Sequence, residues 1–227
     1  MKRIKGARWI QAAAALCTTI LLVATPLYVY VRPTFVEAQY RRASFPPSER
    51  FGAVERSRLS RTLVEYLRHR ASYEDMAALR TDAGEPAMLP SELSHMADVR
   101  RVMDGFFWAQ AVALVALLAG GVVLWRAGAS RHLAAGMRRG VLATVALMGL
   151  ILVSAAVDFD AFFTLFHRLF FREGTWVFYY DDTLIQLYPL PLWVTAVTAV
   201  AVTILAEAGV LYALSPGLTD ARRRAHD

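Results

Sequence analysis

The chain has 227 residues, of which 56% are hydrophobic and 19% are charged, so it is too apolar for an ordinary soluble domain. This composition excludes a disordered chain, and a single cysteine, Cys17, excludes a disulfide scaffold and a cysteine-rich metal site. The net charge of +6 accompanies apolar residues that are gathered into long runs. We therefore expect a membrane protein with no nucleic-acid partner.

Four stretches are long and apolar enough to cross a bilayer as helices: 9–31, 106–125, 141–157 and 192–214. About 20 residues at 1.5 Å each cover a hydrocarbon core roughly 30 Å thick. Backbone groups in hydrocarbon must be satisfied within the segment, which requires helices. The sequence predicts an all-α polytopic membrane protein, with residues 1–227 forming a single membrane domain.

The positions of the cations predict the orientation of these spans. Short segments rich in Lys and Arg stay in the cytoplasm. Such segments are the N-terminus, the loop between the second and third spans, and the C-terminal tail, with Lys2, Arg3, Lys5, Arg8, Arg126, Arg131, Arg138, Arg139, Arg222, Arg223 and Arg224. Both termini are therefore predicted to be cytoplasmic, and segments 32–105 and 158–191 to be extracytoplasmic.

The two outer segments are predicted to form a helical cap. Segment 32–105 carries a helical pattern and a loop at 81–86, and a second helix begins at Pro90 and continues toward the second span. Segment 158–191 holds 11 of the 26 aromatic residues of the chain. Its phenylalanines recur at helical spacing from Phe159 to Phe170, which is typical of a helix that lies at the membrane surface.

Two of the five histidines lie on apolar helix faces in these outer segments. At 100° per residue, His95 shares a face with Val99 and Val102, and Asp98 and Glu92 lie within reach of its ring. His167 lies at the edge of the phenylalanine stripe. Such residues are either satisfied core histidines or a functional pair. His95 reaches the membrane surface only if its helix tilts or breaks, and Gly105 is the expected place for a break.

Two motifs around these histidines resemble a known family. One is Glu92-Leu93-Ser94-His95-Met96-Ala97-Asp98-Val99, and the other is Phe166-His167-Arg168-Leu169-Phe170-Phe171, which is followed by Trp176 and by Asp182-Thr183-Leu184-Ile185. In their order along the chain they resemble the lipoprotein intramolecular transacylases (Lit) and related uncharacterised bacterial membrane proteins.

The resemblance implies an acyl transfer without a cofactor or a metal. The sn-2 acyl chain of a diacylglyceryl-modified cysteine would move to the α-amino group of that cysteine and give a lyso-form lipoprotein. The resemblance implies that His95 and His167 are the catalytic pair. Asp98, Glu92, Arg168, Trp176 and Asp182 are expected to support them. Asp98 would orient an imidazole, which favours His95 as the base, and Arg168 or Trp176 would donate to the oxyanion.

Two other classes of function stay open at this point. A non-enzymatic sensor, chaperone or assembly factor would use the cap for protein contact. A metal-dependent hydrolase would use the same carboxylates and histidines as ligands. In the favoured interpretation the protein resides in the bacterial cytoplasmic membrane, with its site on the extracytoplasmic side, and its partners are a diacylglyceryl lipoprotein and membrane lipids.

Overall fold

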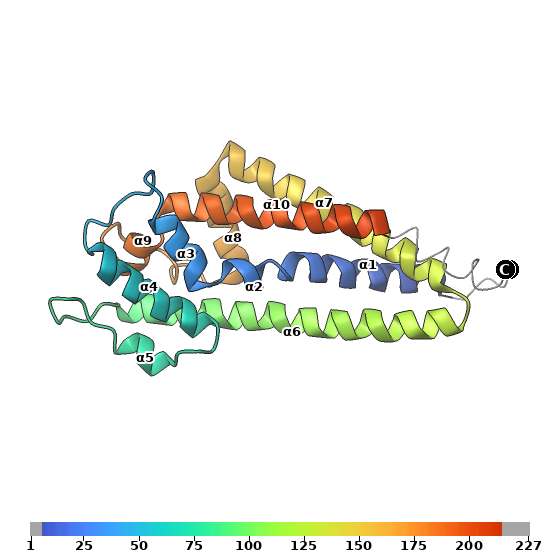
Figure 1. Cartoon of the computed structure of the whole chain (residues 1–227), viewed down its shortest axis with the longest axis horizontal. Coiled ribbons are helices and arrows are strands. Elements are labelled where there is room, and N and C mark those ends of the chain that lie inside the picture. Colours follow the sequence, from blue (N-terminus) through green and yellow to red (C-terminus); the bar gives the residue numbers. More distant parts are fainter. Residues whose placement is uncertain (1–5, 215–227) are drawn as a thin grey trace. The chain divides into compact units, whose positions relative to one another are not determined.

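The computed structural model describes residues 6–214, and it folds them into ten α-helices with no β-strand (Figure 1). The predicted all-α class is therefore confirmed. Most of the terminal cations used for the orientation, Lys2, Arg3, Lys5 and Arg222 to Arg224, lie outside the described residues, and the sidedness of the termini stays a prediction.

Four helical segments are long and apolar enough to cross a membrane. The first, Ala7–Tyr30, comprises α1 (Ala7–Ala24) and α2 (Leu27–Tyr30). The others are α6 (Pro90–Arg126), α7 (Ser130–Val157) and α10 (Leu190–Leu214).

The second of these helices is much longer than its apolar stretch. Helix α6 has 37 residues and runs through Gly105 without interruption, so of the two alternatives the break at this glycine is wrong. A single glycine costs a helix only about 1 kcal/mol, because the backbone hydrogen bonds do not depend on its side chain. Residues 90–105 contain Glu92, Asp98, Arg100, Arg101 and Asp104, so this part of α6 lies outside the membrane-spanning stretch.

The described part of the chain divides into two compact units, and one of them holds most of the apolar helix length: residues 6–27, 106–153 and 200–214. In this unit α1 packs closely on α7. A Cβ atom added at Gly140 would lie 2.5 Å from the Ala15 carbonyl oxygen and 2.7 Å from Thr18 Cβ. Glycine at this position therefore allows the two helix backbones to approach each other.

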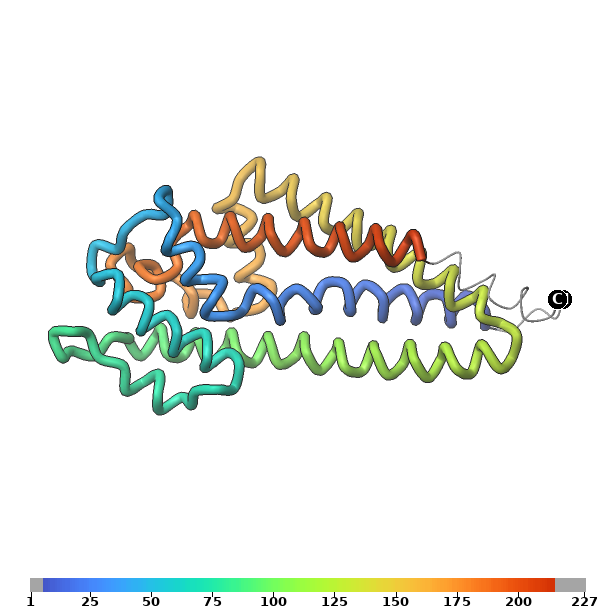
Figure 2. The backbone as a smooth tube through the Cα atoms, in the orientation of Figure 1, coloured from blue at the N-terminus to red at the C-terminus, as the bar shows by residue number. Residues whose placement is uncertain are grey.

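The other unit combines residues 28–105 with residues 154–199, two stretches far apart in the sequence (Figure 2). It contains α3 (Pro33–Tyr40), α4 (Ala53–Leu67), α5 (Tyr73–Ala77), α8 (Phe159–Phe170) and α9 (Thr183–Leu187). Its main core is contributed by α4, α5, α9, the start of α6 and nearby loop residues: Phe51, Leu59, Leu63, Tyr66, Met76, Ala87, Met88, Met96, Leu184 and Leu187.

Candidate active site

The two histidines singled out by the sequence lie side by side in the second unit. His95 comes from the early part of α6 and His167 from the last turn of α8, and their ring centroids are 6.1 Å apart with an interplanar angle of 24°. Each residue is only 8% exposed. The arrangement is a stacked pair of imidazoles held away from bulk water.

An aromatic cage surrounds this pair. The distances between ring centroids are 5.0 Å from His95 to Phe171, 5.4 Å from His95 to Phe178, 3.9 Å from His167 to Phe163, and 4.9 Å from His167 to Trp176. Phe166 completes the cage at 5.5 Å from His167. Phe178 was not singled out by its sequence position, and the only signal for it is the high aromatic content of its segment.

A backbone hydrogen bond fixes the tautomer of His167. Its Nδ1 lies 2.8 Å from the Phe163 carbonyl oxygen, one turn earlier in α8. A carbonyl oxygen only accepts, so Nδ1 carries the proton, and Nε2 of the neutral ring carries the lone pair. His167 therefore presents a basic nitrogen of defined orientation, as the histidine of a catalytic triad does.

Burial keeps both imidazoles neutral. It lowers the pKa of His95 to about 4, to which the neighbouring His167 also contributes, while Asp98 acts weakly in the opposite direction. Burial also lowers the pKa of His167, opposed by its bond to Phe163. Both rings therefore titrate below the ordinary histidine value near 6.5 and accept protons at neutral pH only from a reacting group.

Two of the predicted supporting residues, Asp98 and Arg168, pair with other charged side chains. Asp98 pairs with Arg101 at 2.5 Å, and within residues 6–214 His95 Nδ1 is buried without a hydrogen-bond partner. The expected Asp98–His95 hydrogen bond through Nδ1 is thus not formed, because an arginine three residues further along the helix competes for the carboxylate. Arg168 is exposed and faces Glu173 at 3.4 Å, which does not fit an oxyanion donor.

Glu92 and Asp182 hold the backbone around the site. The Glu92 side chain is fully buried, and its two oxygens accept the Leu89 N–H at 2.8 Å and the Leu184 N–H at 2.7 Å. The first bond caps α6 and the second caps α9, so one carboxylate satisfies donors at two helix N-termini. Asp182 accepts the Tyr179 N–H at 2.7 Å and closes the turn before α9.

Trp176 brings an unused donor to the pair. Its indole Nε1 is buried and has no hydrogen-bond partner within the described chain. A buried N–H without a partner is costly, so native proteins rarely retain one without a purpose. Next to His167, it is a donor that is available for a developing oxyanion.

The carboxylates and histidines weighed as metal ligands do not converge. Over residues 6–214, no group of three or more His, Cys, Asp or Glu side chains is placed to hold a metal ion. Glu92 and Asp182 are instead committed to backbone N–H groups and Asp98 to an arginine.

Fold and site together define an α-helical multi-pass membrane protein with a paired-histidine centre in an aromatic cage. The family model of the lipoprotein intramolecular transacylase Lit matches residues 10–193. The chain therefore belongs to the Lit family, whose members are acyltransferases. A protein of Aquifex aeolicus described only as uncharacterised is 28% identical over 170 residues, which cover 74% of this chain and 75% of that protein.

Solved structures show the same fold. The in meso structure of the integral membrane protein Lit from Bacillus cereus has a TM-score of 0.70 at 19% identity, and the match covers 96% of this chain and 98% of that one. A variant of the same protein with one histidine replaced by alanine has a TM-score of 0.63 at 20% identity, and that match covers 96% of each chain. At this level of identity the likeness supports the four-span fold.

Proposed function

We propose that this protein moves the sn-2 acyl chain of a diacylglyceryl-modified cysteine onto the α-amino group of the same cysteine. Membership of the Lit family supports the reaction class. The observation that carries the mechanism is the neutral, stacked pair of His95 and His167 inside a water-poor aromatic cage. We place this site on the extracytoplasmic side, where the positive-inside rule puts segments 32–105 and 158–191.

The reaction does not require a nucleophile from the enzyme, because the substrate supplies its own amine. It requires a base that accepts the proton of that amine. The amine nitrogen attacks the ester carbonyl carbon, a C–N bond forms, and the C–O bond to the glyceryl oxygen breaks. Amine and ester belong to one molecule, and orienting them can remove roughly 7–11 kcal/mol of the barrier. The cage supplies that orientation by enclosing the reacting groups among rigid rings.

His167 is the base in this proposal. Its Nε2 lone pair accepts the proton that the amine loses, since Nδ1–H is held by Phe163. The same proton then passes to the departing glyceryl oxygen, so the proton balance closes without water. The observed bond of His167 replaces the sequence argument for His95, which depended on an orienting contact with Asp98.

His95 and Trp176 act on the developing negative charge. His95 stays neutral at physiological pH and offers its single ring N–H to the glyceryl ester oxygen or to the oxyanion. The Trp176 indole offers a second donor that has no other partner in the described structure. Fixed donors at a developing oxyanion are among the largest contributions to acyl transfer.

Conversion of a synthetic diacylglyceryl lipopeptide by the purified protein in detergent tests this proposal. Mass spectrometry of fragment ions distinguishes the N-acyl lyso product from the diacyl substrate. We expect His95→Ala and His167→Ala to abolish conversion, and His69→Asn to retain it. Asparagine suits the control because His69 lies outside the cage at φ 58°, a left-handed conformation that asparagine tolerates.

The same assay also distinguishes an enzyme from a sensor or scaffold. Well-folded wild-type protein that gives no N-acyl product would contradict the proposal. Full conversion by His167→Ala would contradict the assignment of the base even if the reaction itself is observed. Insensitivity to a metal chelator is expected, because the residues that would bind a metal are held by other partners.

A further inference from the structure

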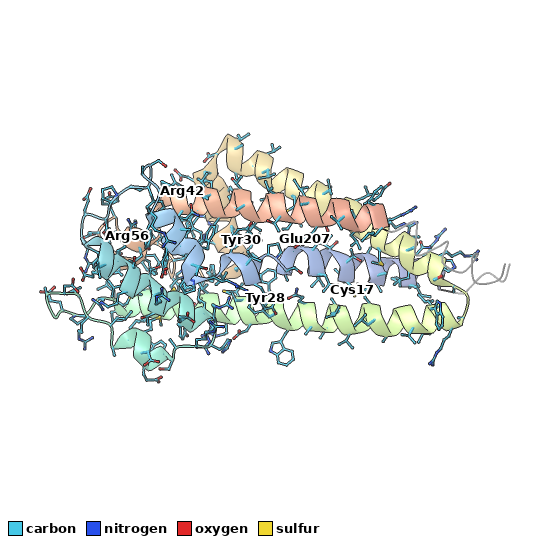
Figure 3. The ribbon with its side chains drawn as sticks, in the orientation of Figure 1. Cys17, Tyr28, Tyr30, Arg42, Arg56 and Glu207 are labelled. Atoms are coloured by element: carbon cyan, nitrogen blue, oxygen red, sulfur yellow. The ribbon has the colours of Figure 1, made fainter. Side chains whose placement is uncertain are left out.

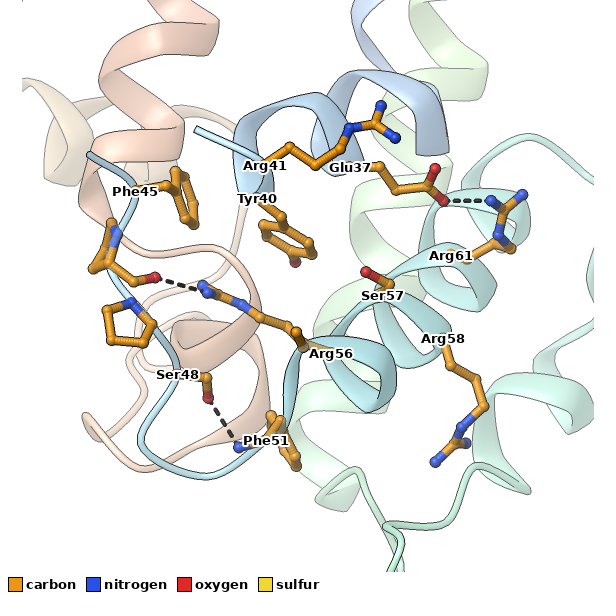
Figure 4. Close-up of a pocket in the computed structure, with 13 residues that line it drawn as sticks. Glu37, Tyr40, Arg41, Phe45, Ser48, Phe51, Arg56, Ser57, Arg58 and Arg61 are labelled. Carbon is orange, nitrogen blue, oxygen red and sulfur yellow. Dashed lines mark hydrogen bonds and ion pairs between the residues drawn. The ribbon is translucent and has the colours of Figure 1, made fainter. Parts of the chain in front are cut away.

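A cavity lies in the same unit, apart from the histidines. It is an open pocket with a volume of about 580 Å³, lined by α3, the start of α4 and the loop between them (Figure 4). None of the residues that line it belongs to the aromatic cage. A cavity of this size matches the volume of small-molecule sites, and it is larger than a single ion requires.

Positive charge dominates its wall. Four arginines and one carboxylate line the cavity: Arg41, Arg56, Arg58, Arg61 and Glu37. Arg61 pairs with Glu37, and Arg58 pairs with Asp82 at 3.1 Å. Within the described residues, Arg41 and Arg56 have no carboxylate partner, so the wall carries two uncompensated cations.

Arg56 is the most telling of these groups because it is only 5% exposed. Its guanidinium carbon lies 4.4 Å from the centre of the Tyr40 ring and 5.0 Å from that of Phe45, and Nη1 donates to the Pro46 carbonyl oxygen at 2.8 Å. Its Nε is buried with no partner in the described chain. A buried guanidinium normally finds an anion, and this one keeps a donor unused.

The start of α4 adds to the positive potential. The helix has 15 residues, its N-cap is Gly52, and no side chain caps its first N–H groups. Ala53, its first residue, lines the cavity. Helix N-termini attract anions through their free N–H groups and the helix dipole, and arginines beside such an end are a common arrangement for phosphate.

We propose that this cavity binds a phosphate group, of the kind that anionic lipid headgroups carry. Glu37 and Arg41 follow Tyr30, the last residue of the first membrane span, by only seven and eleven residues, which favours a lipid as the source. The planar guanidinium groups and the N–H groups at the start of α4 suit phosphate, because its oxygens accept several hydrogen bonds at once.

Calorimetric titration of the full chain in detergent tests the proposal. The probes are inorganic phosphate, short-chain phosphatidylglycerol and acetate, each at matched ionic strength. Arg41→Gln is expected to weaken binding of phosphate or lipid about tenfold, since a hydrogen bond to a charged group is lost. Arg42→Gln is the matched control, because Arg42 (Figure 3) is the next residue, is also exposed and is not among the residues that line the cavity.

Arg56→Lys keeps the charge and removes the planar fork, so it should weaken binding as well. Arg41 lies on the surface, and its substitution keeps the test decisive if Arg56→Lys fails to fold. Binding of phosphatidylglycerol that Arg41→Gln weakens supports the lipid source, and binding of inorganic phosphate alone supports free phosphate. Binding unchanged in Arg41→Gln, or acetate bound as tightly as phosphate, would overturn the proposal. The readout is binding alone, so neither result affects the proposed transacylase activity.

Discussion

Two substitutions of Glu92 distinguish a structural role of this residue from a chemical one. Replacement by alanine leaves two buried N–H groups, of Leu89 and Leu184, without an acceptor. Each unsatisfied buried donor costs about 1–3 kcal/mol, so Glu92→Ala should lose about 2–6 kcal/mol. Glu92→Gln keeps one acceptor oxygen and should lose about half as much.

Removal of the charge offsets part of the glutamine loss. Burial raises the pKa of Glu92 despite its two hydrogen bonds, so the ionised carboxylate is held at some cost. Glu92→Gln avoids that cost while it retains either the α6 or the α9 cap. We therefore expect the order of stability to be wild type, then Glu92→Gln, then Glu92→Ala.

The apparent melting temperature in detergent, measured beside lipopeptide conversion at low temperature, checks this order. Each kcal/mol should move the melting temperature by roughly 2–4 °C in a chain of this size. Glu85→Ala is the control, because Glu85 is an exposed carboxylate in the same outer segment. Loss of all conversion in Glu92→Gln with an unchanged melting temperature would contradict a structural role for Glu92 and would indicate that it takes part in the reaction.

The same structure makes four further predictions. Trp176→Phe should lower conversion roughly a hundredfold in a product assay at a temperature where the variant is folded, since it removes an N–H that has no partner in the described chain; an unchanged rate would contradict its role as a donor. The pH profile of kcat/KM should rise toward pH 8 with the substrate amine, whose pKa is about 7.7–8.0, and should show no histidine limb near 6.5, because the pKa of both His95 and His167 is lowered. Because the pKa of both rings is lowered in the folded protein, these histidines bind more protons in the unfolded chain below pH 6.5. The melting temperature should therefore fall as the pH decreases from 6.5 toward 4, and a rise over this range would contradict the burial of the two rings. Gly140→Ala should cost about 1–3 kcal/mol of stability in a thermal melt, because its Cβ would lie 2.5 Å from the Ala15 carbonyl oxygen; Gly149→Ala, with nothing within 4 Å, should not, and equal effects would contradict the close α1–α7 packing.

The long apolar helices could be predicted from sequence because hydropathy acts locally. A run of about 20 apolar residues has few alternatives to a membrane-spanning helix. Helical periodicity likewise placed His95 on a buried face, and the structure leaves it only 8% exposed. The helix expected from Pro90 toward the second span is also observed as α6, and it does not break at Gly105 because a lone glycine weakens a helix without ending it.

The detailed partners of the site could not be predicted, because they depend on tertiary contacts or on local competition. Glu92 and Leu184 are 92 positions apart, and no spacing rule connects them. Asp98 lies three residues from both His95 and Arg101, so helical geometry offers it two partners. The permanently charged guanidinium of Arg101 attracts the Asp98 carboxylate more strongly than the His95 imidazole does, because burial keeps that ring neutral.

These side-chain choices have a common consequence for the histidine pair. Within residues 6–214, Glu92 and Asp182 are committed to backbone N–H groups and Asp98 to Arg101, and none of the three forms a hydrogen bond with either ring. A carboxylate bonded to an imidazole would stabilise its cation and raise its pKa, so a larger fraction of the rings would already be protonated at neutral pH. The Phe163 carbonyl orients His167 without adding a negative charge. Orientation by a neutral acceptor, inside a cage that disfavours charge, is how the site keeps a weak base both aligned and free to accept a proton from a neighbouring amine.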